Sequence, residues 1–182
     1  MATLLTHAFV GAALADLKTP TINCPSSRVT RWWMVAALCS MVPDIDVVGF
    51  AYGIHYGDLW GHRGMTHSLL FAAAVSIVAA PLIAEQGKTI IAATWLFAIT
   101  ASHGILDAMT NGGLGVAFFS PFDPHRYFFP WRPIAVSPIG THGLFSSRMA
   151  HILVTEFLWV WIPVAVIWIA VRTLRRTQAL ST

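Results

Sequence analysis

Two histidines and an arginine stand close together in segment 61–68, Gly-His-Arg-Gly-Met-Thr-His-Ser. Imidazole is the commonest protein ligand for zinc and its neighbours, and the glycines on either side allow the backbone to turn. His62 and His67 are therefore candidate metal ligands. His67 is favoured of the two because it stands at the expected start of an apolar helix. Arg63 is a candidate contact for a phosphate group of a substrate.

Ligand-type side chains occur at three further places in the sequence. His103 and Asp107 are four residues apart, a spacing that puts both on one face of a helix. Asp44 and Asp46 follow a proline inside an apolar segment, where carboxylates are costly unless they are paired or bound to a metal. His7 lies within the first apolar segment. These residues are separated in sequence, so the helices that carry them must bring them together.

The composition places the chain in a membrane. Of its 182 residues, 56% are hydrophobic and 10% charged, against roughly 25% charged in an ordinary soluble domain. The basic residues behind the net charge of +3 are scattered at the ends of apolar segments, which disfavours nucleic-acid binding. Cys24 and Cys39 are expected to be free thiols. The length suggests one domain over 1–182 and sets no oligomeric state.

Five apolar segments predict an all-α integral membrane protein with about five transmembrane or half-spanning helices. The first is expected to be retained, because it lacks the basic start of a signal peptide. The third is predicted to span the membrane with Thr66 as its N-cap. A long loop, 110–147, precedes the last helix and is expected at the membrane interface, with Arg126 and Arg132 contacting headgroups. The expected helices are 2–17, 32–52 with a break at 43–46, 66–84, 89–109 and 151–171.

The distribution of basic residues predicts which end of each helix faces the cytoplasm. The positive-inside rule places the Arg-rich C-terminus in the cytoplasm and the N-terminus outside. Counting about 1.5 Å per residue from the basic inner ends puts four groups roughly 16–24 Å up their helices, in the outer half of the bilayer. The four are His7, Asp44, His103 and Glu156. Glu156 thereby joins the predicted site, which opens to the outer leaflet.

Histidine and carboxylate ligands without thiolates favour a divalent transition metal, zinc first and manganese or iron as alternatives. More than four candidate ligands indicate one or two ions. Such an ion lowers the pKa of a bound water to near 7, and a pair of ions clamps the oxygens of a phosphoester. The candidate metal ligands are His7, Asp44, Asp46, His62, His67, His103 and Asp107. The candidate catalytic residues are Asp44, Asp46, Arg63 and Glu156, with Asp44 or Asp46 as general base.

The combined motifs resemble those of bacterial inner-membrane, membrane-bound metal-dependent hydrolases described as LexA-regulated. The motifs that carry the resemblance are Thr6-His7, Pro43-Asp44-Ile45-Asp46, His62-Arg63-Gly64-Met65-Thr66-His67-Ser68 and Ser102-His103-Gly104-Ile105-Leu106-Asp107. It continues through 110–113 and 120–122 and so covers essentially the whole chain. The resemblance implies a metal-dependent hydrolase of the inner membrane whose site is formed by the seven candidate ligands.

Three functions follow as hypotheses. The leading one is a hydrolase in which metal-activated water attacks an ester or phosphoester of a membrane lipid or lipid-linked substrate. The second is a transporter or metal-handling protein, although the inner half of the helices is almost purely apolar and a transport path needs polar groups in both halves. The third is a noncatalytic membrane scaffold with a structural metal, which closed coordination would favour.

Overall fold

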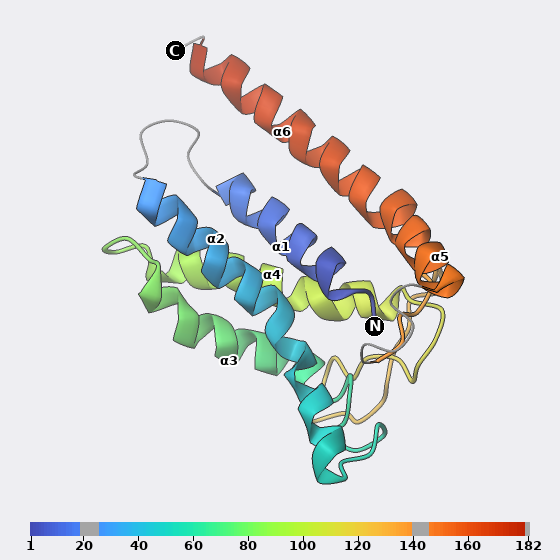
Figure 1. Cartoon of the computed structure of the whole chain (residues 1–182). Helices are drawn as coiled ribbons and strands as arrows, with labels where there is room; N and C mark the ends of the chain where they lie inside the picture. Colours follow the sequence, from blue (N-terminus) through green and yellow to red (C-terminus); the bar gives the residue numbers. More distant parts are fainter. Residues whose placement is uncertain (19–25, 140–145, 181–182) are drawn as a thin grey trace.

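The computed structural model describes residues 1–18, 26–139 and 146–180, and every regular element within these ranges is a helix (Figure 1). Pairing of β type in the described ranges is limited to two isolated bridges, Thr110 with Ile134 and Val116 with Tyr127. The predicted all-α fold class is confirmed. Cys39 is a buried free thiol, whereas Cys24 lies outside the described residues.

The first two helices, α1 (Leu4–Lys18) and α2 (Ser26–Met41), pack closely against each other. The indole Nε1 of Trp32 donates to the carbonyl oxygen of Ala15 at 2.8 Å. Gly11 lies so near α2 that a Cβ atom there would come within 2.6 Å of Ser40 Oγ. This close approach holds the start of α1, which carries His7, beside the end of α2.

After Met41 the chain tightens into a 3-10 helix, η1 (Val42–Tyr52). The predicted break at 43–46 is therefore a change of helix type. Pro43 stands at the start, where its missing N–H leaves no internal bond unmade. Runs of 3-10 helix longer than three or four residues are uncommon, so tertiary contacts must support the 11 residues of η1. Gly53 ends it in the left-handed region at φ 78°.

The predicted third helix begins later and is shorter than expected. Met65–His67 form a 3-10 turn, η2, and α3 covers Leu69–Ala79 before a second 3-10 turn, η3 (Ala80–Leu82). Ser68 caps α3 by accepting a hydrogen bond from the backbone N–H of Phe71 at 3.0 Å. The prediction of Thr66 as N-cap is wrong, because its hydroxyl donates to Asp46 instead.

The prediction that this third segment spans the membrane is also not supported. Leu69–Leu82 is among the shorter apolar helices of the chain. At about 1.5 Å per residue its 14 residues extend about 21 Å, against about 30 Å of hydrocarbon core. Residues 66–68 do not lengthen α3, because η2 ends at His67 and Ser68 has an extended backbone before the helix begins. The third segment is half-spanning by length.

The remaining helices are α4 (Thr89–Ala108) and a long helix in three parts, α5 (Ser147–Glu156), η4 (Phe157–Trp161) and α6 (Ile162–Leu180). The long helix starts before and ends after the predicted range of 151–171. Its middle part, η4, is a π-helix, and the wider turn there accommodates Pro163, whose ring would otherwise press on a preceding carbonyl.

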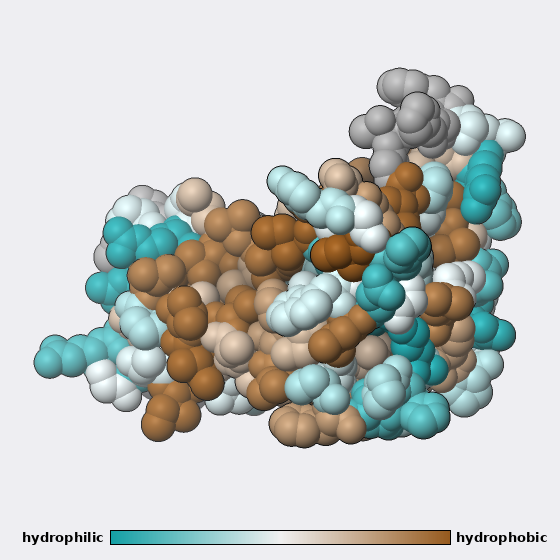
Figure 2. Space-filling model, turned by 90° about the horizontal axis from the view of Figure 1, so that it is seen from below, coloured by the Kyte–Doolittle hydropathy of each residue, from teal (hydrophilic) through white to brown (hydrophobic). Residues whose placement is uncertain are grey.

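Within the described ranges the main helical segments are five, of which three are long and apolar enough to cross a membrane. These three are Ser27–Tyr52, Thr89–Ala108 and Ser147–Gln178, and the two shorter apolar helices are Leu4–Leu17 and Leu69–Leu82. Figure 2 shows hydrophobic residues over the middle of one face and hydrophilic residues toward its sides. Outward side chains such as Val78 and Ile90 are 74% and 83% exposed, as expected for a surface that lipid covers.

One end of the bundle is filled by an apolar cluster. The cluster joins the end of α1, the start of α2, the end of α3 and the start of α4, and its buried members are Ala15, Trp32, Ala36, Cys39, Ala79, Ala80, Ala92, Leu96 and Ile99. The loops 53–64 and 110–139 gather at the opposite end (Figure 1). The candidate site residues lie toward that opposite end, so the apolar cluster separates them from the basic helix ends.

Candidate metal centre

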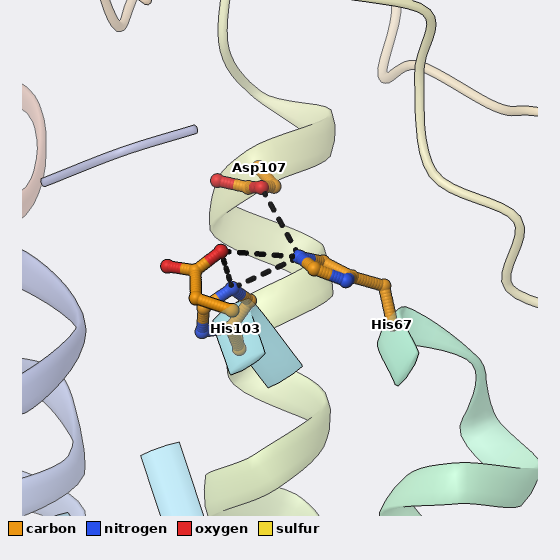
Figure 3. A group of neighbouring side chains, drawn as sticks. His67, His103 and Asp107 are labelled. Carbon is orange, nitrogen blue, oxygen red and sulfur yellow. Dashed lines mark hydrogen bonds and ion pairs between the residues drawn. The ribbon is translucent and has the colours of Figure 1, made fainter. Parts of the chain in front are cut away.

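Carboxylates from η1 and α4 and imidazoles from η2 and α4 meet in one buried group. Asp44 Oδ1 lies 3.6 Å from His67 Nε2 and 3.4 Å from His103 Nε2. The two Nε2 atoms are 3.1 Å apart, and His67 Nε2 is 3.5 Å from Asp107 Oδ2. Figure 3 shows His67, His103 and Asp107 pointing toward one another. Bonds of about 2.0–2.1 Å to a tetrahedral ion give ligand separations of about 3.3 Å, which these distances match.

The protonation of each histidine is set by its other ring nitrogen. His103 Nδ1 lies 2.7 Å from the carbonyl oxygen of Ser40, which can only accept, so Nδ1 carries the proton. His67 Nδ1 lies 3.1 Å from Thr66 Oγ1 and 3.2 Å from Asp46 Oδ2; because the Thr66 hydroxyl gives its own proton to Asp46, Nδ1 donates toward these two oxygens. Both Nε2 atoms therefore turn lone pairs toward each other and toward carboxylate oxygens. Such an arrangement repels itself unless a proton or a metal ion lies among these atoms.

The field at His67 is strongly negative. Burial lowers the pKa of its imidazole, but hydrogen bonds with Asp107, Asp44 and Asp46 outweigh burial and raise that pKa to about 10. All four donors of the group are buried, and the side chain of Asp44 is 6% exposed while those of the other three are at 0%. The group therefore attracts a positive charge in a place from which water is almost excluded, and Asp44 lies at its outer edge.

Asp46 holds the two loop histidines in position. Its Oδ1 accepts from His62 Nδ1 at 2.8 Å, and its Oδ2 accepts from Thr66 Oγ1 at 2.6 Å and from the backbone N–H of Arg63 at 3.2 Å. With His67 Nδ1 the carboxylate has four donors around it. Asp46, His62 and His67 also lie close enough to hold an ion as a set. To bind an ion together with Asp46 and His62, His67 would have to use Nδ1, the nitrogen whose proton faces Asp46. The geometry therefore fits Asp46 better as a carboxylate that orients the two histidines.

The loop before η2 can pack this tightly because of its glycines. A Cβ at Gly61 would collide with the carbonyl oxygen of His55, and one at Gly64 with that of Leu59. Arg63 between them adopts φ 63°, which turns its backbone N–H toward Asp46. The Gly-His-Arg-Gly pattern thus serves a close backbone crossing that aims His62 and His67 at the same carboxylate.

The sequence predicts that Arg63 contacts a substrate phosphate. In the structure Arg63 is buried in the interior instead. Its side chain is at 0% exposure, and Nε donates to Asp107 Oδ2 at 3.0 Å. Nη1 donates to the carbonyl oxygen of Gly112 and Nη2 to Thr110 Oγ1, both at 2.9 Å. The guanidinium thus has three acceptors from the chain, which favours a role in orienting Asp107. The backbone N–H of Ala2 donates to Asp107 Oδ1 at 2.7 Å and fixes the other oxygen.

Several buried polar atoms of the site have no hydrogen-bond partner within the described part of the chain. They are both ring nitrogens of His7, both carboxylate oxygens of Asp44 and Nε2 of His62. His7 stacks on His103 with ring centroids 3.6 Å apart, and its Nε2 is 3.5 Å from Asp107 Oδ1. Buried polar groups are rarely left without partners, so these atoms are donors available to a bound species.

Glu156, the last residue of α5, lies beside the start of α1 and outside both groups of described residues that could hold an ion. Its Oε1 accepts from the backbone N–H of Thr3 at 2.5 Å, and its Oε2 from the hydroxyl groups of Thr3 and Thr6 at 2.5 and 2.7 Å. Trp161 Nε1 also donates to Thr6 Oγ1 at 2.7 Å. The predicted catalytic carboxylate thus binds the first turn of α1, directly before His7.

Sequence reasoning missed several supporting groups. The carbonyl oxygen of Ser40 and the acceptors at Thr110 and Gly112 carried no signal of their own, because their partners lie more than 40 residues away. Arg126 was expected at a lipid headgroup, yet its guanidinium donates to the carbonyl oxygens of Tyr56, Asp58 and His62 and ties the loop 110–139 to the loop 53–64. The glycines of 110–113 were the available signal, since glycines without periodicity often mark a tight contact.

Fold and site together define an all-helical membrane protein with a buried His–Asp group that could hold a metal ion. The family described as YdjM inner membrane protein matches residues 1–179, and the chain belongs to that family. It is 32% identical over 169 residues to the inner membrane protein YbcI of Escherichia coli (strain K12), covering 90% of this chain and 92% of the relative. No solved structure matches it.

Proposed function

We propose that the protein is a membrane-bound metal-dependent hydrolase. The observation that carries the proposal is the group of Asp44, His67, His103 and Asp107, whose facing atoms lie 3.1–3.6 Å apart with lone pairs directed inward. Nitrogen and oxygen donors without sulfur suit zinc, and also manganese or iron. A divalent ion that takes a water as a fifth ligand beside these four donors would supply Lewis acidity and a water of lowered pKa for attack on an ester or phosphoester.

The residues of the chain divide the remaining tasks. Asp46 has its oxygens engaged by four donors, so the general base we propose is Asp44, whose Oδ2 has no partner among the described residues and lies at the outer edge of the site. Arg63 and Ala2 hold Asp107 from both sides. The two unpaired nitrogens of His7 are placed to bind a second ion or a substrate oxygen.

A lipid or lipid-linked substrate is supported by what surrounds Asp44. Along η1, Ile45 and Val48 are 59% and 57% exposed, and Leu5 on α1 is 63% exposed. Apolar side chains with this exposure on a membrane protein face lipid. A substrate that reaches Asp44 past them carries an apolar portion, whereas a small soluble ester has no reason to approach through this surface.

The orientation we propose puts the N-terminus and the site on the outer side of the inner membrane and the C-terminus in the cytoplasm. It rests on the basic residues that gather at the helix ends opposite the loops. Cysteine labelling at Thr177 and Phe122 from one side of intact cells tests it. Label entering only at Phe122 supports the orientation, and label entering only at Thr177 reverses it.

The motif resemblance also implies LexA regulation, which a comparison of transcript levels with and without LexA tests.

A structural metal is the second candidate, because four protein donors suffice to close a tetrahedral site. It predicts a bound ion without turnover. A transport function has less support, since the cluster from Ala15 to Ile99 fills the other half of the bundle with apolar side chains. The buried hydroxyl of Thr100 there donates to the backbone carbonyl of Leu96 and is not available to line a path.

The test combines metal analysis with turnover in matched variants. Purified protein is expected to contain about one transition-metal ion per chain, and His103→Ala and Asp107→Asn are expected to lose the ion. The matched controls are His125→Ala and Asp123→Asn, which alter a surface pair with the His125 side chain 82% exposed. Hydrolysis of phosphate and carboxylate esters of lipids should disappear with the metal. A metal-loaded protein without turnover on any such ester would leave the structural role as the better account.

A further inference from the structure

A groove with a basic head and an apolar floor runs along α2 at the end of the bundle opposite the metal centre. Its wider part is a hollow of about 640 Å³ between the start of α2 and the turn joining α3 to α4, lined among others by Arg28, Arg31, Leu82 and Glu85. A second hollow of about 460 Å³ shares Arg31 and continues along the helix. The two hollows together extend from the helix end toward the middle of the molecule.

The head of the groove carries an excess of positive charge. Arg28 Nη1 pairs with Glu85 Oε1 at 3.0 Å, and Lys88 Nζ pairs with Glu85 Oε2 at 2.5 Å. With Arg31 there are three cations and one anion, which leaves a net charge of +2. An anionic group is therefore attracted to this place.

The floor of the groove is apolar and follows one helix face. Met34, Val35 and Leu38 lie three, four and seven residues after Arg31, a spacing that keeps them on the same side of α2. Met34 and Leu38 are 60% and 64% exposed. From Arg31 to Leu38 the helix rises about 10 Å, which is a distance over which an acyl chain extends alongside.

The groove also lies at the basic end of the molecule. Arg175 of α6 donates to the carbonyl oxygen of Leu17 at the end of α1, and Trp32 near the start of α2 donates to Ala15. The ends of α1 and α6 and the start of α2 therefore share one level. Basic clusters at this level of a membrane protein attract acidic phospholipids of the cytoplasmic leaflet.

We propose that this groove binds an acidic phospholipid, with the phosphate between Arg28 and Arg31 and an acyl chain along Met34 and Leu38. The occupant is a bound lipid distinct from any substrate, because the apolar cluster of the bundle separates the groove from the metal centre. The proposal does not depend on hydrolase activity.

Native mass spectrometry of the full-length protein with phosphatidylglycerol and phosphatidylcholine tests the proposal. The wild type should retain phosphatidylglycerol in preference. Each basic residue near an anionic membrane contributes about fivefold, so Arg28→Gln with Arg31→Gln should weaken the preference roughly 25-fold. The matched control, Arg175→Gln with Arg176→Gln, removes the same charge at the same end but outside the groove, and should retain the preference.

A second variant keeps the test decisive if the double substitution misfolds. Glu85→Gln removes the competing anion, so it should strengthen phosphatidylglycerol retention about fivefold. Equal retention of both lipids by the wild type, or an unchanged double variant, would overturn the proposal. Displacement of the lipid by millimolar inorganic phosphate would make this a free-phosphate site and overturn it too, as would lipid-free dimers that occupy the groove with a second copy.

Discussion

Asp46→Asn is the substitution that most sharply separates a metal ligand from a residue that orients ligands. Asp46 accepts from His62 Nδ1, His67 Nδ1, Thr66 Oγ1 and the backbone N–H of Arg63. Asparagine keeps the shape but replaces one acceptor oxygen by an NH₂ group. That NH₂ group would face a donor, so one histidine must turn or change its tautomer.

The expected cost follows from which histidine changes. If the amide nitrogen faces His67, the imidazole moves its proton to Nε2, the atom that lies 3.1 Å from His103 Nε2 and is needed for the ion. Loss of such an orienting partner typically weakens metal affinity by about 10–100-fold, or about 1.4–2.7 kcal/mol. His103→Ala removes a donor outright and is expected to cost more than this.

Competition with a chromophoric chelator measures the affinity in detergent. Asp123→Asn is the control, since Asp123 also accepts from a histidine and a hydroxyl but lies on the surface. An affinity within twofold of wild type would refute the orienting role. A loss as complete as in His103→Ala would show instead that Asp46 binds the ion itself.

Three further outcomes are expected. Arg63→Lys keeps the charge but reaches one of three acceptors, so it should destabilise the fold by roughly 2–5 kcal/mol in denaturant unfolding, while Arg132→Lys on the surface should be neutral. Because the pKa of His67 is raised to about 10, the metal-free site holds a proton at pH 7–9. Metal binding should therefore release about one proton, and the affinity for the metal should rise about tenfold per pH unit between pH 7 and 9. Calorimetry in buffers of different ionisation enthalpy checks this, and a buffer-independent heat would contradict it. Ser68→Ala should cost about 1 kcal/mol by removing the cap of α3, whereas Thr94→Ala, on an exposed part of α4, should cost little.

The sequence was informative where local spacing decides the outcome. The interval between His103 and Asp107 predicted one shared helix face, and α4 carries both into the same buried group. Counting along the helices predicted that His7, Asp44 and His103 lie at a similar level, and both His7 and Asp44 lie beside His103. These arguments succeed because the rise and period of a helix are fixed by its backbone hydrogen bonds.

The sequence was less informative where a tertiary partner decides the outcome. Thr66 has the residue type of an N-cap, but Asp46, twenty residues away, takes its hydroxyl and Ser68 caps the helix instead. Arg63 is of a residue type that usually lies at the surface, and it can be buried because Asp107, Thr110 and Gly112 supply three acceptors. The third helix was likewise predicted too long, because Thr66, His67 and Ser68 were counted as helix, whereas they form η2 and the cap before α3.

The central claim is that one divalent ion sits among four named atoms. Crystals of the purified protein, measured above and below the absorption edge of the metal found by elemental analysis, test it most directly. We expect an anomalous peak about 2.0–2.2 Å from Asp44 Oδ1, His67 Nε2, His103 Nε2 and Asp107 Oδ2. Refined density with these four atoms in place and no anomalous peak between them, from protein loaded with the metal, would contradict the account.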